Sequence, residues 1–443
     1  MSFPRYPEYK ASGIDWLGEV PKHWETLPLS RTTSENTSLF IDGDWIESKD
    51  LSEDGIRYLT SGNVGDGFYK EQGQGYISEE TFASLNCVEV LPGDVLISRL
   101  NLPVGRSCVV PDLGGRIVTC VDNVIVRPDS QFDRRFFVYQ LSSKSHFANM
   151  ENLARGTTMQ RISRSVLGRV RFSYPPSTEQ IRIADFLDGE TAKIDALIAE
   201  QRRLMELLKE KRQAVITQAV ISGLNLNTTF KKSEVEWLGD VPEHWAIGRM
   251  SNVFHEVADA GNEELPILSV SIHHGVSDRE MDEEEMDRKV SRSEDRSKYK
   301  QVLPGDLVYN MMRAWQGGFG TVTVPGMVSP AYVVARPKSQ MNTAYVEHLL
   351  RTPQAIEQMR RHSRGVTDFR LRLYWDEFKN LAVLIPPIDE ANAICAEIAE
   401  MDRRFNNLAE SCQQSIDLLQ ERRTALISAA VTGEIDVRSV YGH

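Results

Sequence analysis

Cysteine is scarce in this chain of 443 residues, and its five cysteines form no Cys-x-x-Cys pair. Such a set is typical of reduced, buried thiols, so we expect neither a disulfide framework nor a cysteine zinc site. The sequence also lacks an apolar run of about 20 residues, the length that a membrane-spanning helix needs. Residues 1–10 contain no apolar stretch of the secretory kind. We therefore expect a cytoplasmic protein that does not span a membrane.

Motifs of the common catalytic sites are missing as well. The chain contains no GxxxxGK[ST] phosphate loop, no GxGxxG turn, no HExxH motif and no GxSxG elbow. DNA amino-methyltransferases place an acceptor before two prolines and an aromatic ring after them, and residues 174–177 and 385–388 keep only the prolines. Adjacent histidines on an extended chain point to opposite sides, and His273 and His274 have no further ligand at metal-binding spacing. We therefore expect neither a catalytic centre nor a metal site.

The sequence does contain an internal repeat with a period of about 210 residues. This period is too long for a solenoid and is typical of a duplicated domain with its connecting helix. Residues 31–89 and 251–301, which lie between repeated segments, share little, so the pattern indicates one scaffold with two different inserts. The repeated segments are DWLGEVPKHW at 15–24 and EWLGDVPEHW at 236–245, VLPGD at 90–94 and 302–306, Arg-Pro at 127–128 and 336–337, Arg-Gly at 155–156 and 364–365, and LLKEKRQAVITQAVISG at 207–223 with LLQERRTALISAAVTG at 418–433.

Charge is distributed unevenly along both halves, within a net charge of −12. Residues 1–94 carry 7 basic and 17 acidic side chains, whereas residues 95–172 carry 12 basic and 5 acidic ones. The second half repeats this change, with 2 basic and 15 acidic side chains in 234–287 and 15 basic and 6 acidic ones in 288–372. A basic sector at the same place in each half indicates a nucleic-acid surface. A solvated face that balances acidic neighbours remains the alternative.

A long helix is predicted where the repeat ends in the first half. Residues 177–180 (Ser-Thr-Glu-Gln) fit a capping box at its start, and Gly223 fits its end. Between them, mostly apolar residues recur at alternating spacings of four and three over residues 183–218. This predicted seam includes Leu197 and Leu204.

The same stripe returns 211 residues later, in residues 394–429. A helix of about 44 residues is about 65 Å long, which exceeds what one domain of this size covers. The simplest partner is the other long helix, and antiparallel pairing into a coiled coil would relate the two halves by a pseudo-twofold axis. The alternative, in which each helix packs on its own domain, remains open. Strand-like stretches such as 118–126 and 328–334 predict mixed α/β (α+β) domains outside the helices.

Together the repeated segments resemble the specificity (S) subunit of Type I restriction-modification enzymes. The resemblance rests on the two helical signatures, the two DWLGEVPKHW-like openings and GTTMQRISRSVLGRVRFSYPPSTEQIRIADFLD at 156–188, and it covers the whole chain. The second half departs from the pattern in two places. Residues 386–391 lack the glutamine of the first helix entry, and Gly-Val-Thr-Asp-Phe-Arg at 365–370 replaces Gly-Thr-Thr-Met-Gln-Arg at 156–161.

The resemblance implies a DNA-reading subunit that is not an enzyme and binds no cofactor itself. Residues 1–177 and 225–388 would form two target-recognition domains, and each would read one part of a bipartite, asymmetric double-stranded DNA target. The helical regions, residues 178–224 and 389–437, would act as a spacer and would dock two modification subunits, which use S-adenosylmethionine to methylate adenine. Restriction subunits, which use ATP and Mg2+, would join this core. Two other hypotheses remain: a coiled-coil assembly scaffold without DNA reading, and a single-chain DNA methyltransferase or nuclease.

Base contacts are expected from side chains on loops of the basic sectors, because arginine can pair with guanine, and asparagine or glutamine with adenine. Any one of these arginines could instead contact phosphate or form a surface ion pair. Tryptophans of the repeated openings are expected to be core anchors, and they are Trp16, Trp24, Trp237 and Trp245. The DNA-binding candidates are Asn63, Arg99, Asn101, Arg106, Arg155, Thr157, Thr158, Gln160 and Arg161 in the first half, and His273, His274, Asn310, Arg313, Trp315, Gln316, Arg364, Thr367, Asp368 and Arg370 in the second.

Overall fold

Two units make up the chain in the computed structural model. Unit 1 combines Met1–Gln201 with Gln413–His443, and unit 2 is Arg202–Cys412. Each unit therefore contains one globular part and a portion of both long helices, α5 (Ser177–Ser222) and α10 (Ile388–Val431). No helix among the described residues has the length and apolar character to cross a membrane. The structure describes residues 3–73, 75–156, 159–225, 227–262, 264–272, 275–281, 298–365 and 371–438.

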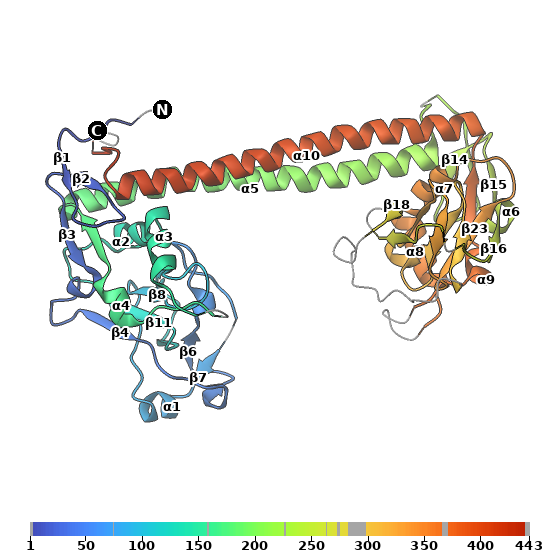
Figure 1. Cartoon of the computed structure of the whole chain (residues 1–443). Coiled ribbons are helices and arrows are strands. Elements are labelled where there is room, and N and C mark those ends of the chain that lie inside the picture. The colour runs from blue at the N-terminus through green and yellow to red at the C-terminus, as the bar shows by residue number, and fades with distance from the viewer. Residues whose placement is uncertain are drawn as a thin grey trace. The chain divides into compact units, whose positions relative to one another are not determined.

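The globular part of unit 1 is a mixed α/β domain built around the antiparallel sheet β4-β11-β8-β9. Helices α2 and α3 lie between this sheet and the long-helix segments of the unit (Figure 1). A second sheet, β10-β6-β7-β5, packs beside the first, and β12 pairs with β3. The elements are β1 (Tyr9–Ala11), β2 (Glu19–Pro21), β3 (Glu25–Pro28), η1 (Leu29–Arg31), β4 (Leu39–Asp42), η2 (Ser48–Asp50), β5 (Leu51–Ser52), β6 (Ile56–Leu59), η3 (Ser61–Asn63), β7 (Tyr76–Ile77), α1 (Glu79–Ser84), β8 (Val95–Ser98), β9 (Ser107–Val109), β10 (Ile117–Thr119), β11 (Asn123–Arg127), α2 (Arg134–Leu141), α3 (Lys144–Leu153), α4 (Arg164–Arg169) and β12 (Arg171–Tyr174).

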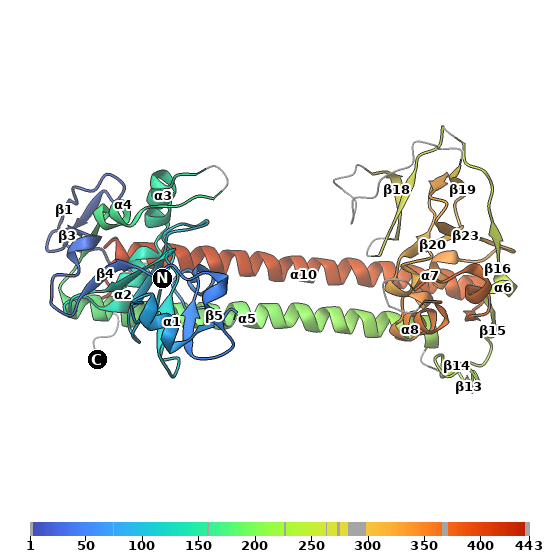
Figure 2. The ribbon, with the colours of Figure 1, turned by 90° about the horizontal axis from the view of Figure 1, so that it is seen from below.

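Unit 2 repeats this frame with a sheet of the same strand order, β16-β23-β20-β21. Its α7 lies against the unit's own long-helix segments (Figure 2). There the Tyr345 hydroxyl donates to the carbonyl of Val220 (2.7 Å). Strand β24 pairs with β15 as β12 pairs with β3. The elements are β13 (Phe230–Lys232), β14 (Asp240–Pro242), β15 (Ala246–Arg249), α6 (Met250–Val253), β16 (Phe254–Val257), β17 (Leu268–Ser271), β18 (Gly275–Glu280), β19 (Lys300–Val302), β20 (Leu307–Asn310), η5 (Ala314–Gln316), β21 (Phe319–Thr321), β22 (Gly326–Val328), β23 (Tyr332–Pro337), α7 (Thr343–Leu350), α8 (Pro353–His362), α9 (Trp375–Phe378) and β24 (Ala382–Ile385).

Within each unit, the segments of α5 and α10 pack against each other. In unit 1 the Arg423 guanidinium pairs with Asp195 at 3.0 Å, and in unit 2 Arg212 pairs with Asp402 at 2.7 Å. The seam differs from the predicted one by one residue in half of its positions. Leu197 and Leu204 are 51% and 44% exposed, whereas the next residue, Ile198, is buried. The predicted heptad phase was wrong here. A stripe that alternates steps of four and three residues and one that alternates steps of three and four share every second position and differ by one residue at the others.

Helix α5 does not begin with the predicted capping box. The Gln180 side chain instead accepts a hydrogen bond from the amide of Asp133 (2.9 Å) and donates to the carbonyl of Pro175 (2.9 Å). Asp133 is the residue that caps α2, so Gln180 joins the start of α5 to the start of α2. This contact fixes the angle between the long helix and the globular part of unit 1.

The repeated opening motif has the same structural role in both units. The Trp24 indole donates to Glu179 in the first turn of α5, and the Trp245 indole donates to Glu390 in the first turn of α10 (3.1 and 2.9 Å). Both tryptophans are fully buried, which confirms their expected role as core anchors, whereas Trp16 and Trp237 are half-buried.

Each buried tryptophan also touches the glycine that ends the other long helix. Gly433 lies against Trp24, and Gly223 lies against Trp245. Both glycines have a left-handed backbone, with φ near +77°, that favours glycine at a helix end. One motif thus clamps the start of one helix and the end of the other.

The repeated VLPGD and Arg-Pro segments also meet. Asp94 accepts hydrogen bonds from two guanidinium nitrogens of Arg127, Nε and Nη2, at 2.7 Å each. Asp306 accepts from the same two nitrogens of Arg336 at 3.0 Å each. Each carboxylate is almost fully buried and also accepts a hydrogen bond from the backbone amide of the residue three positions earlier. These arginines belong to the basic sectors, but their charge is neutralised inside the protein.

The five cysteines are free thiols in the structure. Cys87, Cys108, Cys120 and Cys412 are buried, as expected, and Cys395 is half-buried. No group of histidine, cysteine and carboxylate side chains suited to a metal ion occurs in the part of the chain that the structure describes.

Candidate nucleic-acid interface

A hairpin and a loop meet at the edge of the main sheet in unit 1. The turn between β8 and β9 packs against α3. Gly105 in this turn lies so close to the Met150 side chain of α3 that a Cβ atom on residue 105 would clash with it. The loop that follows α3 then returns to the hairpin. The amide of Asn101 donates to the carbonyl of Gln160 (3.0 Å), and the amide of Ile162 donates to the carbonyl of Arg99 (3.0 Å).

Unit 2 builds the same junction from different residues. The connection between β20 and β21 contains η5, and the loop after α8 returns to it through the amide of Leu373, which donates to the carbonyl of Met311 (2.8 Å). Arg351 supports the hairpin from α7, since its guanidinium donates to the carbonyl of Phe319 (2.8 Å) and lies over that ring. Ile162 and Leu373 are both buried, so both junctions are anchored in the core.

A pair of arginines closes the returning loop in each unit. Arg155 and Arg161 exchange two backbone hydrogen bonds (3.0 and 2.9 Å), and Arg364 and Arg372 do the same (2.9 Å each). Segment 365–370, which replaces 156–161 in the sequence, is therefore not equivalent to it residue by residue. The second loop is two residues longer, and Arg372 occupies the place of Arg161.

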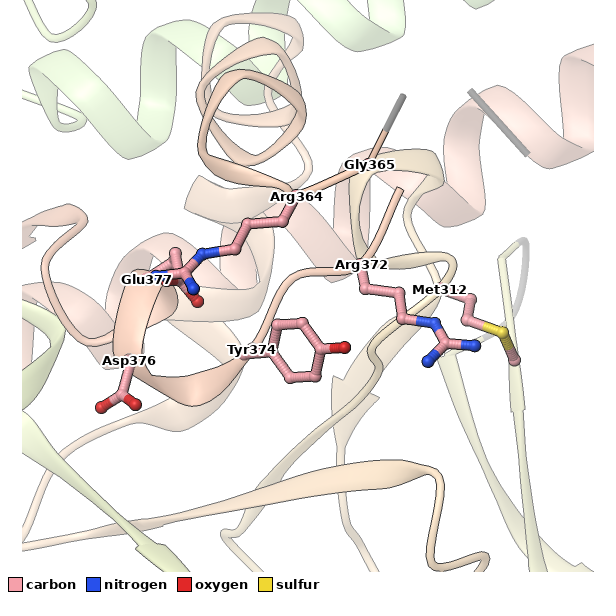
Figure 3. A pocket seen from close by; sticks show the side chains of 7 residues that line it. All are labelled: Met312, Arg364, Gly365, Arg372, Tyr374, Asp376 and Glu377. Atoms are coloured by element: carbon pink, nitrogen blue, oxygen red, sulfur yellow. The ribbon is translucent and has the colours of Figure 1, made fainter. Parts of the chain in front are cut away.

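The arginine pair of unit 2 lines a cavity of about 800 Å³. Figure 3 shows Arg364 reaching toward Glu377, with which it forms an ion pair, whereas Arg372 points the other way, toward Met312. The ring of Tyr374 lies between them. One oxygen of the Glu377 carboxylate is buried and has no hydrogen-bond partner among the described residues. The cavity therefore offers an exposed cation, Arg372, beside the aromatic face of Tyr374.

Several candidates serve the protein's own structure. The Asn63 amide is buried and donates to the carbonyls of Lys70 and Gln72 (3.1 and 2.8 Å). Arg99 pairs with Asp42 at 3.2 Å and also bonds to the carbonyl of Val121. The Trp315 ring packs against the core of unit 2. We therefore do not retain these three as base-contacting residues.

The other candidates divide into three sets. Asn101, Arg155, Arg161, Gln316 and Arg364 are exposed at the two junctions, and Arg106, Gln160, Asn310 and Arg313 are half-buried there. The candidates Thr157, Thr158, His273, His274, Thr367, Asp368 and Arg370 lie outside the described residues.

Internal ion pairs use much of the positive charge in the basic sectors. Besides Arg127 and Arg336, Arg116 binds Glu79 and Glu89, and Arg135 binds Asp185 and Asp188 on α5. The hydrogen bonds that Arg127 donates to Asp94 hold the pKa of Arg127 above its usual value, so its guanidinium stays charged at neutral pH. Net charge by segment therefore overstates the cationic surface, and the exposed arginines at the junctions matter more.

Arg372, Tyr374 and Met312 are cavity residues that the sequence reasoning missed. The signal for Arg372 was present in the buried aliphatic residue that follows each closing arginine, Ile162 or Leu373. Aligning the two loops on that residue, rather than on their glycines, gives the correct register. Tyr374 and Met312 have no counterpart in the repeat that could have indicated them.

Comparison with known proteins agrees with the resemblance seen in the motifs. A family model described as the Type I restriction modification DNA specificity domain matches residues 33–206. The EcoBI specificity subunit of Escherichia coli is 23% identical over 322 residues, which cover 69% of this chain and 67% of that protein. The EcoKI specificity subunit of Escherichia coli (strain K12) is 20% identical over 450 residues, covering 94% of this chain and 90% of that protein.

A chain of a solved type I R-M system, described for its complex assembly and conformational transition, shares the fold. It aligns with a TM-score of 0.63 at 13% identity and covers 93% of this chain and 98% of itself. Residues 33–206 thus match the model of a Type I restriction modification DNA specificity domain, and the chain is similar over nearly its whole length to the EcoKI specificity subunit.

Proposed function

We propose that the chain is the DNA-reading specificity subunit of a Type I restriction-modification complex, and that each half reads one part of a bipartite, asymmetric target. One observation carries this proposal: the same four-stranded frame and the same hairpin–loop junction occur twice, with different surroundings. Two DNA-binding domains with the same frame but different surfaces suit a target with two unlike parts. Two modest sites on one chain also bind far more tightly together than either does alone.

In this proposal residues 1–177 and 225–388 are the recognition domains, and residues 178–224 and 389–437 are the helical regions. The two long antiparallel helices form a coiled coil that separates the domains about a pseudo-twofold axis. The repeated tryptophan clamps support this arrangement, because each one holds the start of one helix and the end of the other.

Docking of two modification subunits is supported by exposed leucines at repeated positions of the helices. Leu197 of α5 corresponds to Leu408 of α10, and Leu207 corresponds to Leu418, and each of the four is at least half exposed. In unit 1 the ion pair between Asp195 and Arg423 places Leu197 and Leu418 at similar heights along the helix pair. Pairs of leucines that are exposed to water are typical of a surface that binds another protein.

A groove of about 940 Å³ in unit 1 adds to this surface. It lies between the opening hairpin, α3 and the last turns of α10. Its lining contains four carboxylates and one basic residue, Lys144, together with apolar residues such as Ala425, and the carboxylates are Glu19, Asp417, Glu421 and Glu434. The complementary segment of a modification subunit would be basic with an apolar anchor.

Catalysis belongs to the partners in this proposal. S-adenosylmethionine would be bound by the modification subunits, and ATP and Mg2+ by the restriction subunits. The specificity chain would act in the cytoplasm, where the host DNA lies.

The docking surface can be tested by counting bound partners. Leu418→Asp in unit 1 or Leu207→Asp in unit 2 is expected to lower the number of modification subunits per chain from two to one, and the double variant should bind none. Leu85→Asp, at another exposed leucine directly after α1, is the control. Retention of two subunits by the double variant would contradict this docking surface.

DNA reading can be tested by a mobility-shift assay with the chain and its modification subunit on cognate and random duplex. The affinity for cognate DNA should be at least about 1,000-fold higher and should fall steeply with salt, because phosphate neutralisation releases counterions. Equal affinity for both duplexes would instead favour an assembly scaffold. Binding of S-adenosylmethionine by the isolated chain would favour an enzyme.

The spacer role can be tested by changing the length of α5. Four residues inserted after Glu200 add about one turn, roughly 6 Å, and keep the seam nearly in phase. The unread gap of the target should grow by about one or two base pairs, because B-DNA advances about 3.4 Å per base pair. An unchanged gap would show that the helices do not set the distance.

A further inference from the structure

The two arginines that close each loop differ in how the protein holds them. The first arginine of each pair is engaged: Arg155 donates to the carbonyls of Asn152 and Ala154 (3.2 and 2.9 Å), and Arg364 forms an ion pair with Glu377. The second arginine of each pair, Arg161 or Arg372, is exposed, and among the described residues its guanidinium has no hydrogen-bonding or ionic partner. One arginine in each pair is therefore free to bind a ligand.

The free arginine is also held in place along its backbone. It is tied on one side to the first arginine and is followed by a buried residue that hydrogen-bonds to the hairpin. In unit 1 the carbonyl of Arg99 accepts from Ile162, and in unit 2 the carbonyl of Met311 accepts from Leu373. A guanidinium that starts from such a fixed backbone loses less conformational freedom on binding.

We propose that Arg161 and Arg372 are equivalent phosphate-binding residues that position the DNA on each recognition domain and do not read its sequence. This inference rests on the proposed DNA-reading function. The two arginines share residue type, backbone pairing and anchoring, whereas the loops before them differ in length and sequence. The strands outside the main sheets are also arranged differently in the two units. A contact made by the shared frame suits the feature that two unlike half-targets share, which is the phosphodiester backbone.

The chemistry of the two possible contacts predicts different substitution patterns. Arginine reads guanine through two hydrogen bonds in a fixed fork, which lysine does not reproduce well. Lysine does bind phosphate as a point charge. A phosphate role therefore predicts that lysine restores most of the affinity, and a base-reading role predicts that it does not.

The test uses the full chain with its modification subunit and measures binding to cognate and random duplex over a range of salt concentrations. Arg161→Ala and Arg372→Ala should each weaken binding to both duplexes by the same factor, about tenfold. The slope of log affinity against log salt should become shallower by about 0.9 for each lost contact. Arg161→Lys and Arg372→Lys should recover most of the affinity, and the methylated sequence should stay the same in all four variants.

Arg404→Ala serves as the matched control, because Arg404 is an exposed arginine on α10 that pairs with Glu400. It should change neither the affinity nor the slope. Loss of discrimination at one half of the target in Arg161→Ala or Arg372→Ala would overturn the phosphate role and identify a base reader. Wild-type affinity in both alanine variants would also overturn it. If the wild-type complex itself did not distinguish the two duplexes, the proposed function would fail instead.

Discussion

In unit 1, β5, β6 and β7 of the first insert join β10 in a four-stranded sheet, β10-β6-β7-β5, beside the main sheet. In the corresponding place, the described residues of unit 2 form the two separate pairs β17-β18 and β19-β22. The main sheets themselves have the same strand order. Several residues that the halves share are buried and have a structural role, such as Trp24 and Asp94 with their counterparts. The comparison teaches that repetition in this chain marks the frame, and that differences in reading must come from what the frame carries.

The largest effect is expected when the clamp of either unit is broken. Trp24→Ala or Trp245→Ala should lower the free energy of unfolding of its unit by about 3–5 kcal/mol, because a fully buried indole and its hydrogen bond are lost. Urea unfolding followed by circular dichroism measures this change. Trp16→Ala, at a half-buried repeated position, should cost about half as much. Equal costs at both positions would show that burial in the clamp is not the reason for the repetition.

The stability of the two units should respond differently to acid, because α3 of unit 1 contains a buried histidine where α8 of unit 2 has an alanine. Burial lowers the pKa of His146 on α3 to about 4, and the corresponding residue of α8 is Ala355. As pH falls from about 6.5 to 4, this histidine binds a proton in the unfolded chain but not in the folded one. The free energy of unfolding therefore falls by roughly 3 kcal/mol.

His146→Leu should remove this contribution, which is measured by urea unfolding at several pH values. Burial also lowers the pKa of His348 in unit 2, so some acid sensitivity will remain in the variant. A variant with the same pH dependence as the wild type would mean that His146 is not kept neutral by its surroundings.

The buried ion pairs should respond alike in both halves. Asp94→Asn and Asp306→Asn keep the shape of the side chain but remove the buried charge partner of Arg127 or Arg336. Arg336 keeps a second ion pair with the exposed Asp259 (2.8 Å), which contributes little because it faces water. Each change is expected to cost about 2 kcal/mol, less than for a fully buried pair because the arginines are partly exposed. Asp54→Asn, at an exposed turn, is the control for thermal unfolding. A large difference between the two variants would break the equivalence of the two frames.

The smallest effect concerns the corrected helix seam. Ile198→Val should lower the free energy of unfolding by about 1 kcal/mol because it leaves a small cavity at a buried position. Leu197→Val, one residue earlier and half exposed, should change it by less than about 0.5 kcal/mol. Thermal unfolding of the two variants compares them directly, and the reverse order would restore the seam predicted from the sequence.

Much of the frame could be predicted from the sequence because duplication shows twice which residues matter. The mixed α/β content, both long helices and the anchoring role of Trp24 and Trp245 follow from repeated segments. The heptad phase could not be fixed, because Leu197 and Ile198 are both apolar and only packing distinguishes them. Gln180 fitted a capping box, but a tertiary contact with Asp133 took its side chain instead.

The candidate interface was harder to predict, because arginines look alike in a sequence. Arg99 and Arg161 were equivalent candidates, yet one is bonded within the protein and the other is exposed. Arg372 was missed because a two-residue difference in loop length displaced the alignment. These differences depend on contacts between segments far apart in the chain, which composition and spacing do not contain.

The most direct test of the central claim is a map of methylated adenines in the host genome, made for the wild-type chain and for a chimera in which residues 1–177 come from a relative. The wild type should give one bipartite target with two unlike parts. The chimera should change one part of that target and leave the other part and the gap unchanged. A change in both parts, or a chimera that folds and assembles but methylates the original target, would contradict independent reading by two domains on a common frame.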